Sequence, residues 1–234
     1  LGHAIFCYPD LYDPLENSAG IGAFGLMSGG AWGKKQGEYG GATPTHLMAW
    51  SKYKSDGSLC YKDILSLMGT ENTANYNGVV FELPDNISSN TSSVALYHTT
   101  HTNFNTKIIN ISGKTKEYFM LENIGHDGYQ AGLDYLLGGN DNTSGIAIWH
   151  IDDNQSNNGA DVNHKLVDLE EAAEAGMDNS SHSGKQTNLF FSGNKTEFSD
   201  STDPNSKTYS GTSSGIIIDN ISASGDSMTF DVTF

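Results

Sequence analysis

The opening stretch of this chain decides its fold: it begins LGHAIFCYPDLYD at residues 1–13 and ends FGLMSGGAWG at residues 24–33. Pro9 stops any helix that contains His3, and Asp10 and Asp13 come soon after it. A glycine-rich loop then leads to Met27, and backbone of that composition does not settle into long regular elements. We therefore expect the end of a helix, an acidic loop and a methionine-containing turn.

His3 is the first candidate for a metal ligand. A zinc peptidase of the HExxH class places two His ligands on one helix face, and the Glu after the first His acts as general base on the zinc-bound water. Of such a motif this sequence contains only Leu-Gly-His, so His3 would be the second His. We expect the first His and the catalytic Glu immediately before Leu1, which predicts that this chain alone is inactive.

Further segments follow in a fixed order and carry a resemblance to a known family. They are PDLYD (9–13), GLMSGG (25–30) with Trp32, TPTHLMAWSKY (43–53), EYFMLEN (117–123), GIAIWHID (145–152) and VDLEEA (167–172). In this order they resemble the motifs of the M6 family of secreted metallopeptidases, the immune inhibitor A-like group. The matches span most of the chain.

The resemblance implies a fold, a reaction and a set of ligands. The expected fold is α+β and zincin-like, with short helices at the front and a mostly β body. The expected activity is zinc-dependent hydrolysis of peptide bonds in proteins by a metal-activated water, in a secreted or cell-surface protein of bacterial origin. His3 and Asp10 are the expected zinc ligands, with Asp13 and Glu122 as alternatives, and Met27 forms the expected apolar floor beneath the metal.

The sequence also departs from the family pattern, which keeps a second function open. Phe6 occupies the position where the family has a Gly, and one extra residue precedes Asp10. A Gly there normally lets the helix end in a left-handed turn, so the route to Asp10 must differ. Asp10 and Asp13 could instead accept backbone N–H groups or bind calcium within their loop. The alternative function is a non-catalytic binding module with a degenerate peptidase fold.

The composition of the chain limits the classes of partner that we expect it to bind. The chain has 234 residues, with 12 Lys and Arg against 28 Asp and Glu and a net charge of -16. This charge argues against binding nucleic acid, whose phosphates require basic surface, and against anionic membranes. No apolar run approaches the roughly 18–20 residues of a membrane span. We expect a monomer that acts on a protein or peptide and holds cations, either zinc alone or zinc and calcium.

The pattern of apolar residues predicts one short helix and then mostly strands. A helix is expected at 46–53 and a second helical piece at 61–68. Strands are expected at 79–83, 94–97, 107–111, 118–123, 146–151, 166–169, 216–218 and 228–234. Residues 1–184 would form the C-terminal portion of the catalytic domain, and residues 185–234 a β tail packed on it. Cys7 and Cys60, the two cysteines, could pair or stay as thiols.

Several polar residues on these elements are further candidates. Apolar residues on both faces of strand 146–151 indicate a central, buried strand, from whose end His150 and Asp152 would emerge at a cleft edge. His46 either lies near the cleft or closes a helix end.

The carboxylates of the predicted strands leave two alternatives open. Glu122, inside an apolar strand, is either paired with another side chain or a cation ligand. Asp152, Asp153 and Asp168 could form a loose calcium site, or they belong to solvated loops.

Overall fold

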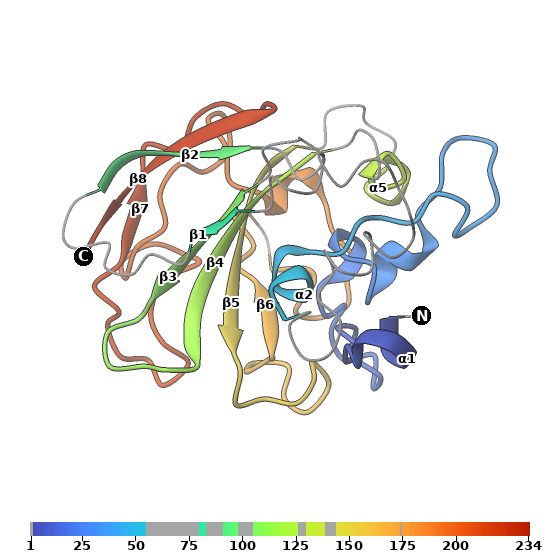
Figure 1. Ribbon diagram of the computed structural model, residues 1–234, viewed down its shortest axis with the longest axis horizontal. Helices are drawn as coiled ribbons and strands as arrows, with labels where there is room; N and C mark the ends of the chain where they lie inside the picture. The colour runs from blue at the N-terminus through green and yellow to red at the C-terminus, as the bar shows by residue number, and fades with distance from the viewer. Residues whose placement is uncertain are drawn as a thin grey trace.

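The computed structural model describes residues 2–54, 80–82, 91–97, 105–125, 130–138, 144–173 and 175–234, and two β-sheets organise them (Figure 1). A five-stranded sheet has the order β1-β3-β4-β5-β6 and a three-stranded sheet the order β2-β8-β7. The strands are β1 (Val80–Glu82), β2 (Thr91–Tyr97), β3 (Asn105–Asn110), β4 (Glu117–Ile124), β5 (Gly145–Asp152), β6 (Val167–Leu169), β7 (Ile217–Asp219) and β8 (Ser227–Thr233). Their pairings are antiparallel, apart from the parallel pair β1–β3.

The helices that the structure describes are short. They are α1 (Gly2–Phe6), α2 (Ala49–Tyr53) and α5 (Leu133–Leu136), with 3-10 turns η1 (Gly22–Phe24), η2 (Gly29–Trp32) and η4 (Gln186–Asn188). Few short helices and mostly antiparallel sheets make the fold α+β, as the sequence predicts. None of the described helices combines the length and the hydropathy that crossing a bilayer requires.

Strands β4 and β5 form the centre of the molecule. They pair in register from Glu117↔Asp152 to Ile124↔Gly145, and every residue of both strands is buried. Alternate side chains enter two separate cores, since successive residues of a strand point to opposite faces. The expectation that strand 146–151 is central and buried is confirmed.

The two hydrophobic cores lie on opposite faces of the five-stranded sheet, and other parts of the chain cover each of them. On one face, Met120 and Trp149 pack with Phe24, Met48 and other residues of the opening 54 residues. On the other face, Phe119 and Ile148 pack with side chains of β7, β8 and the loop around Phe198. Figure 1 shows α1, α2 and α5 on one side of the large sheet and β7 and β8 on the other.

The tail of the chain is built into the body of the molecule. Strand β8 pairs with β2, which precedes it by more than a hundred residues, and β7 pairs with β8. Residues 185–234 therefore share a sheet with a strand from the front of the chain. The predicted helical piece at 61–68 and Cys60 lie outside the described residues, and Cys7 is an exposed free thiol.

The predicted helix at 46–53 begins three residues late, at Ala49. Its N-cap, Met48, has extended backbone angles. The preceding segment is held by distant loops, because the Gln130 side chain accepts a hydrogen bond from the His46 N–H and the His46 carbonyl accepts one from Leu26. These contacts hold the segment extended, so the helix starts after them.

The first helix ends in a left-handed residue despite the missing glycine. Cys7, directly after α1, has φ of 53°. The left-handed turn that a Gly would provide is therefore kept and falls on Cys7, one position after Phe6. Tyr8 then folds back over the helix, and its N–H donates to the Gly2 carbonyl at 3.3 Å.

The acidic loop depends on a glycine that no other residue can replace without strain. Gly20 has φ of +58°, and a Cβ there would lie 2.1 Å from the Leu11 carbonyl oxygen. Leu11 in turn donates its N–H to the Met27 carbonyl and accepts from Ile21. Gly20 thus allows the loop that carries Asp10 to close against the turn that carries Met27.

We predict that Gly20→Ala destabilises the protein by more than 2 kcal/mol, because left-handed strain adds to an unavoidable backbone clash. Gly37→Ala is the matched control, since Gly37 also has positive φ, +85°, with nothing within 4 Å of its added Cβ. That variant should lose only about 1 kcal/mol. Urea unfolding midpoints compare the two, and equal losses would contradict the assigned clash.

Candidate functional site

His3 and Asp10 face each other at the surface end of α1. The His3 Nε2 atom lies 2.9 Å from Asp10 Oδ1, and the two side chains are 59% and 36% exposed. The other ring nitrogen, Nδ1, lies 2.7 Å from the Tyr8 carbonyl oxygen. The turn at Cys7 therefore brings two residues that flank it into contact.

The hydrogen bond to Tyr8 fixes which nitrogen of His3 is free. A carbonyl oxygen only accepts, so Nδ1 must carry the proton and donate it. When the ring is neutral, Nε2 presents a lone pair to a carboxylate oxygen at 2.9 Å. Two acceptors at that distance repel unless a proton or a metal cation lies between them. A backbone carbonyl on the distal nitrogen is also the usual partner of a metal-ligating His.

Asp10 is held in place through its second oxygen. The Tyr12 hydroxyl donates to Asp10 Oδ2 at 3.1 Å, which leaves Oδ1 directed at His3. The main chain after Asp10 is anchored by the bond from Leu11 N–H to the Met27 carbonyl at 3.0 Å. Tyr12 is a contact that the sequence analysis missed, although its position two residues after Asp10 is a local signal.

Met27 packs directly beneath the first turn of α1. Its side chain is buried, and a Cβ added at Gly2 would lie 2.6 Å from its sulfur. Gly2 is therefore the residue that lets the methionine approach the helix next to His3. His3, Asp10 and Met27 line one cavity of about 720 Å³.

The His nitrogen and the Asp oxygen are ligand atoms that zinc accepts, and the distance between them is close to that of two zinc ligands. Bonds of about 2.0–2.2 Å place two ligands of a tetrahedral zinc ion roughly 3.4 Å apart, so the observed 2.9 Å needs to open by about half an ångström. The exposed faces of both side chains leave room for additional ligands. Within the described ranges, no group of three or more His, Cys, Asp or Glu side chains is placed to hold a metal.

No family model matches the chain, and no curated protein is significantly similar to it.

Asp13 and Glu122, the alternative zinc ligands, lie in other surroundings. Asp13 is buried and accepts hydrogen bonds from the backbone of Leu15, Asn17 and Ser18 at 2.8–3.0 Å. Its carboxylate thus closes its own loop. Glu122 is also buried, and it accepts from Ala49 N–H at 2.9 Å and faces Lys52 Nζ at 3.6 Å. Of the two alternatives for Glu122, the structure therefore has the paired one.

The three calcium candidates each bind donors of the protein. Asp152 accepts from Asn154 and from His164 Nε2 at 2.7 Å. Asp153 accepts from Trp50, Lys54 and Tyr118. Asp168 accepts from Lys165 Nζ at 2.6 Å. The three carboxylates thus point to different partners and do not converge on one point.

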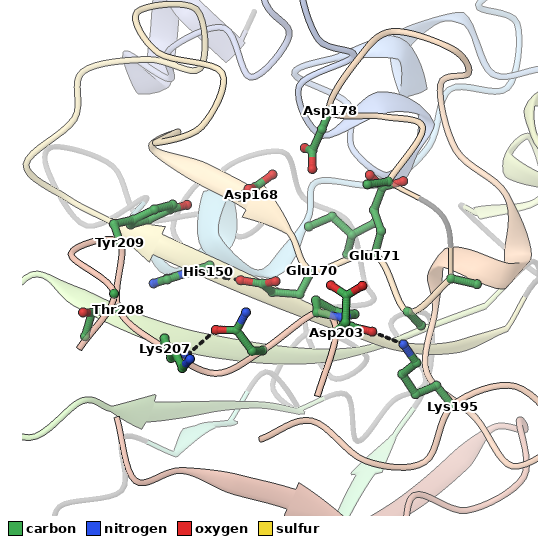
Figure 2. Close-up of a pocket in the computed structure, with 17 residues that line it drawn as sticks. His150, Asp168, Glu170, Glu171, Asp178, Lys195, Asp203, Lys207, Thr208 and Tyr209 are labelled. Carbon is green, nitrogen blue, oxygen red and sulfur yellow. Dashed lines mark hydrogen bonds and ion pairs between the residues drawn. The ribbon is translucent and has the colours of Figure 1, made fainter. Parts of the chain in front are cut away.

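His150 lies in a separate pocket of about 580 Å³, shown in Figure 2. We call it the acidic pocket, because Asp168, Glu170, Glu171 and Asp178 line it. The sheet register creates it, since His150 is the cross-strand partner of Asp168. His150 thus lines a pocket separate from the cavity at His3, and Asp152, expected beside the same cleft, lines neither. His46, the other cleft candidate, is partly buried outside both pockets, and burial and the charge of Lys52 lower its pKa to about 3.

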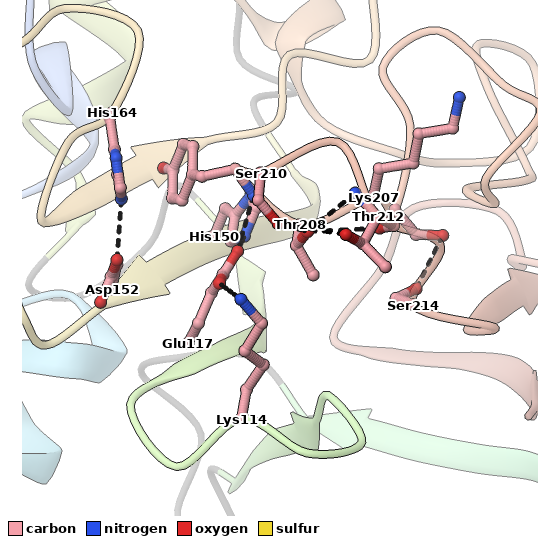
Figure 3. Close-up of polar contacts among 12 residues, drawn as sticks. Lys114, Glu117, His150, Asp152, His164, Lys207, Thr208, Ser210, Thr212 and Ser214 are labelled. Carbon is pink, nitrogen blue, oxygen red and sulfur yellow. Dashed lines mark hydrogen bonds and ion pairs between the residues drawn. The ribbon is translucent and has the colours of Figure 1, made fainter.

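Both nitrogens of the His150 ring have a carboxylate partner. Its Nδ1 lies 3.0 Å from Glu170 and its Nε2 3.2 Å from Glu117, and Figure 3 shows the link onward from Glu117 to Lys114. The ring stacks on Tyr209, with centroids 4.0 Å apart. Burial opposes the charged ring, but the hydrogen bonds with Glu117 and Glu170 outweigh it and raise the pKa of His150 to about 9.

The sequence analysis also missed Tyr209, which lines this pocket, and Lys165, which pairs with two of the carboxylates that line it. Lys165 is fully buried and is held between Asp168 and Asp178. Burial opposes its charge, but the two carboxylates raise its pKa. Tyr209 stacks on His150 and also on His164, and its N–H donates to Glu117, 92 positions earlier. No local pattern could have predicted that contact.

We predict that Glu122→Gln destabilises the protein by about 3–5 kcal/mol, because it removes the carboxylate facing the buried Lys52 ammonium. Burial already lowers the pKa of Lys52 to about 8. The double variant Glu122→Gln/Lys52→Met is the control and should recover most of the loss. Guanidinium unfolding measures both. A single variant of unchanged stability that loses bound zinc would instead make Glu122 a ligand.

We also predict that His150 makes stability fall as the pH rises from about 6.5 to about 9. The pKa of His150 is raised from 6.5 to about 9, so its contribution is fully present below the lower value and absent above the upper one. At 1.36 kcal/mol per pKa unit the contribution is on the order of 3 kcal/mol.

Unfolding free energies of the wild type and His150→Gln between pH 6 and pH 9 check this, and their difference should shrink by about 3 kcal/mol toward the alkaline end. His164→Gln is the control. Its ion pair with Asp152 is one-third exposed on the His side, so removing it should change stability by about 1 kcal/mol or less. A constant difference between wild type and His150→Gln across the range would refute the assigned protonation.

Proposed function

We propose that this chain is part of a secreted zinc endopeptidase of the M6 type with a zincin-like fold, and that His3 and Asp10 are two of its zinc ligands. The observation that carries the proposal is the opposition of His3 Nε2 and Asp10 Oδ1 at 2.9 Å, with Nδ1 committed to the Tyr8 carbonyl. When the ring is neutral, a proton on Asp10 or a metal cation between the two side chains removes the repulsion of the two acceptors, and we propose the metal.

The surroundings of the pair support the same proposal. Tyr12 orients Asp10 through its second oxygen, as the outer partners of metal ligands do. Met27 lies beneath the pair, which matches the methionine turn that the resemblance implies. Glu122 and Asp13 are engaged with Lys52 and with loop amides, so Asp10 is the better candidate for the oxygen ligand.

The chemistry follows from the roles of these residues. Bound zinc would supply a Lewis acid and an activated water for attack on a peptide carbonyl. His3 and Asp10 would hold the ion, and Tyr12 would keep Asp10 oriented. The remaining His and the general-base Glu are proposed to precede Leu1, as the HExxH motif requires. On this proposal the 234-residue chain binds zinc weakly and does not cleave protein.

The test uses the protein extended upstream by the residues encoded before Leu1. We predict stoichiometric zinc and caseinolytic activity, both lost in Asp10→Ala and in His3→Ala, because each variant removes one ligand. Glu38→Gln is the control, since Glu38 binds Lys35 and Thr43 in an exposed loop and should leave zinc and activity unchanged.

Other outcomes have distinct meanings. Zinc and activity that survive in Asp10→Ala would move the oxygen ligand to Asp13 or Glu122. An extended protein with neither zinc nor activity would favour the alternative, a binding module that keeps the fold without the chemistry. Zinc-dependent cleavage by the 234-residue chain alone would contradict the assignment of the general base to the residues before Leu1.

A further inference from the structure

The acidic pocket beside His150 is separate from the cavity at His3. Among the described residues the two cavities share no lining side chain. The volume of the acidic pocket, about 580 Å³, falls within the range of roughly 300–1,000 Å³ that is usual for ligand sites. Figure 2 shows carboxylates on several sides of one open space. The pocket is therefore large enough for an organic group and offers acceptors from more than one direction.

Negative charge exceeds positive charge in the described lining of this pocket. The carboxylates are Asp168, Glu170, Glu171, Asp178 and Asp203, and the cationic side chains are His150, Lys195 and Lys207. Lys165 adds one more positive charge through its pairs with Asp168 and Asp178. Burial and neighbouring carboxylates raise the pKa of Asp168, and they raise the pKa of Glu171 to about 7. A further cation inside the pocket would stabilise the ionised carboxylates.

Several of these carboxylates have an oxygen left for a ligand. Glu170 contacts His150 through Oε1, whereas Asp168 and Asp178 accept from Lys165 through their Oδ1 atoms. Within the described part of the chain, the second oxygen of each of the three makes no hydrogen bond. An ionised carboxylate has about four lone-pair sites, so each of these groups can accept from a ligand and keep its present contact.

The hydroxyl of Tyr209 is buried and has no hydrogen-bond partner among the described residues. Figure 2 shows the Tyr209 ring extending from its backbone toward Asp168. The ring is held in place because it stacks on both His150 and His164, and its backbone N–H donates to Glu117. A buried hydroxyl without a partner is unfavourable. A donor that entered the pocket would remove this cost.

We propose that the acidic pocket binds the guanidinium group of arginine. A guanidinium is a planar cation with five N–H donors, and it pairs with a carboxylate through two parallel hydrogen bonds. Glu170, Asp168 and Tyr209 supply acceptors for it from different sides. Ala172 and Pro204 also line the pocket, and they offer apolar surface to the methylene stem. The site does not depend on the peptidase function proposed above, because the two cavities are separate.

The test titrates small ligands into the extended protein by isothermal titration calorimetry. N-acetyl-arginine amide carries the guanidinium as a polypeptide would, and N-acetyl-citrulline amide replaces it with a neutral urea group of similar shape. We expect the arginine compound to bind at least tenfold more tightly than the citrulline compound, and more tightly than N-acetyl-lysine amide. Free arginine distinguishes the two sources of the group. Weaker binding of free arginine supports an arginine within a polypeptide, and tighter binding supports the free amino acid.

Two variants assign the binding to this pocket. Tyr209→Phe keeps the stacked ring, and it should weaken the arginine compound about fivefold while the urea unfolding midpoint stays equal or rises, because the hydroxyl has no partner in the free protein. Glu170→Gln keeps an acceptor for His150 and should weaken binding at least tenfold. Asp161→Asn is the matched control, since it makes the same change of charge at an exposed residue outside the pocket. Its affinity should equal that of the wild type.

Three outcomes would overturn the proposal. The first is equal affinity for the arginine compound and for either the citrulline or the lysine compound. The second is calcium chloride that binds stoichiometrically and excludes the arginine compound, because the pocket would then be a metal site. The third is a Tyr209→Phe protein that loses stability and keeps its affinity, which would give the hydroxyl a role in the fold alone.

Discussion

The structure depends on one constraint, the burial of β4 and β5 on both faces. Eight paired positions run between these strands, so neither strand has a solvent face on which to place polar groups. The opening residues must cover one face and the tail strands the other. A charged residue within the strands then needs a partner inside the protein, and Glu122 has Ala49 and Lys52.

This constraint explains how much of the fold the sequence could predict. Both central strands carry apolar residues at successive positions, which predicts them as strands, and for 146–151 the same pattern predicts burial on both faces. Helix α2 was predicted with the right C-terminal end but an early start, because the bond from His46 to Gln130 joins residues 84 positions apart. Helix propensity depends on the local sequence, so it cannot predict a hydrogen bond from a side chain in a distant loop.

The candidate site residues also include a local group that the sequence could predict and a long-range group that it could not. His3, Asp10 and Tyr12 lie within one local motif, in which the turn at Cys7 brings the first two together. The acidic pocket is lined by residues of β5, β6, the loop after β6 and the tail, and its Tyr209 donates its backbone N–H to Glu117 across 92 positions. A sequence pattern can therefore suggest His150 as a residue at a cleft edge, but it cannot identify the groups that surround it.

The two histidines show why one is a candidate ligand and the other is not. Each has a carboxylate within hydrogen-bond distance. His150 has one on each nitrogen and is 4% exposed, so it holds both protons and offers no lone pair to a metal. His3 gives one proton to a backbone carbonyl and turns its second nitrogen toward a single carboxylate at the surface. Because Nδ1 is committed to the Tyr8 carbonyl, Nε2 is the nitrogen at which a proton or a metal cation can lie between His3 and Asp10, and the pair lies at the edge of a cavity.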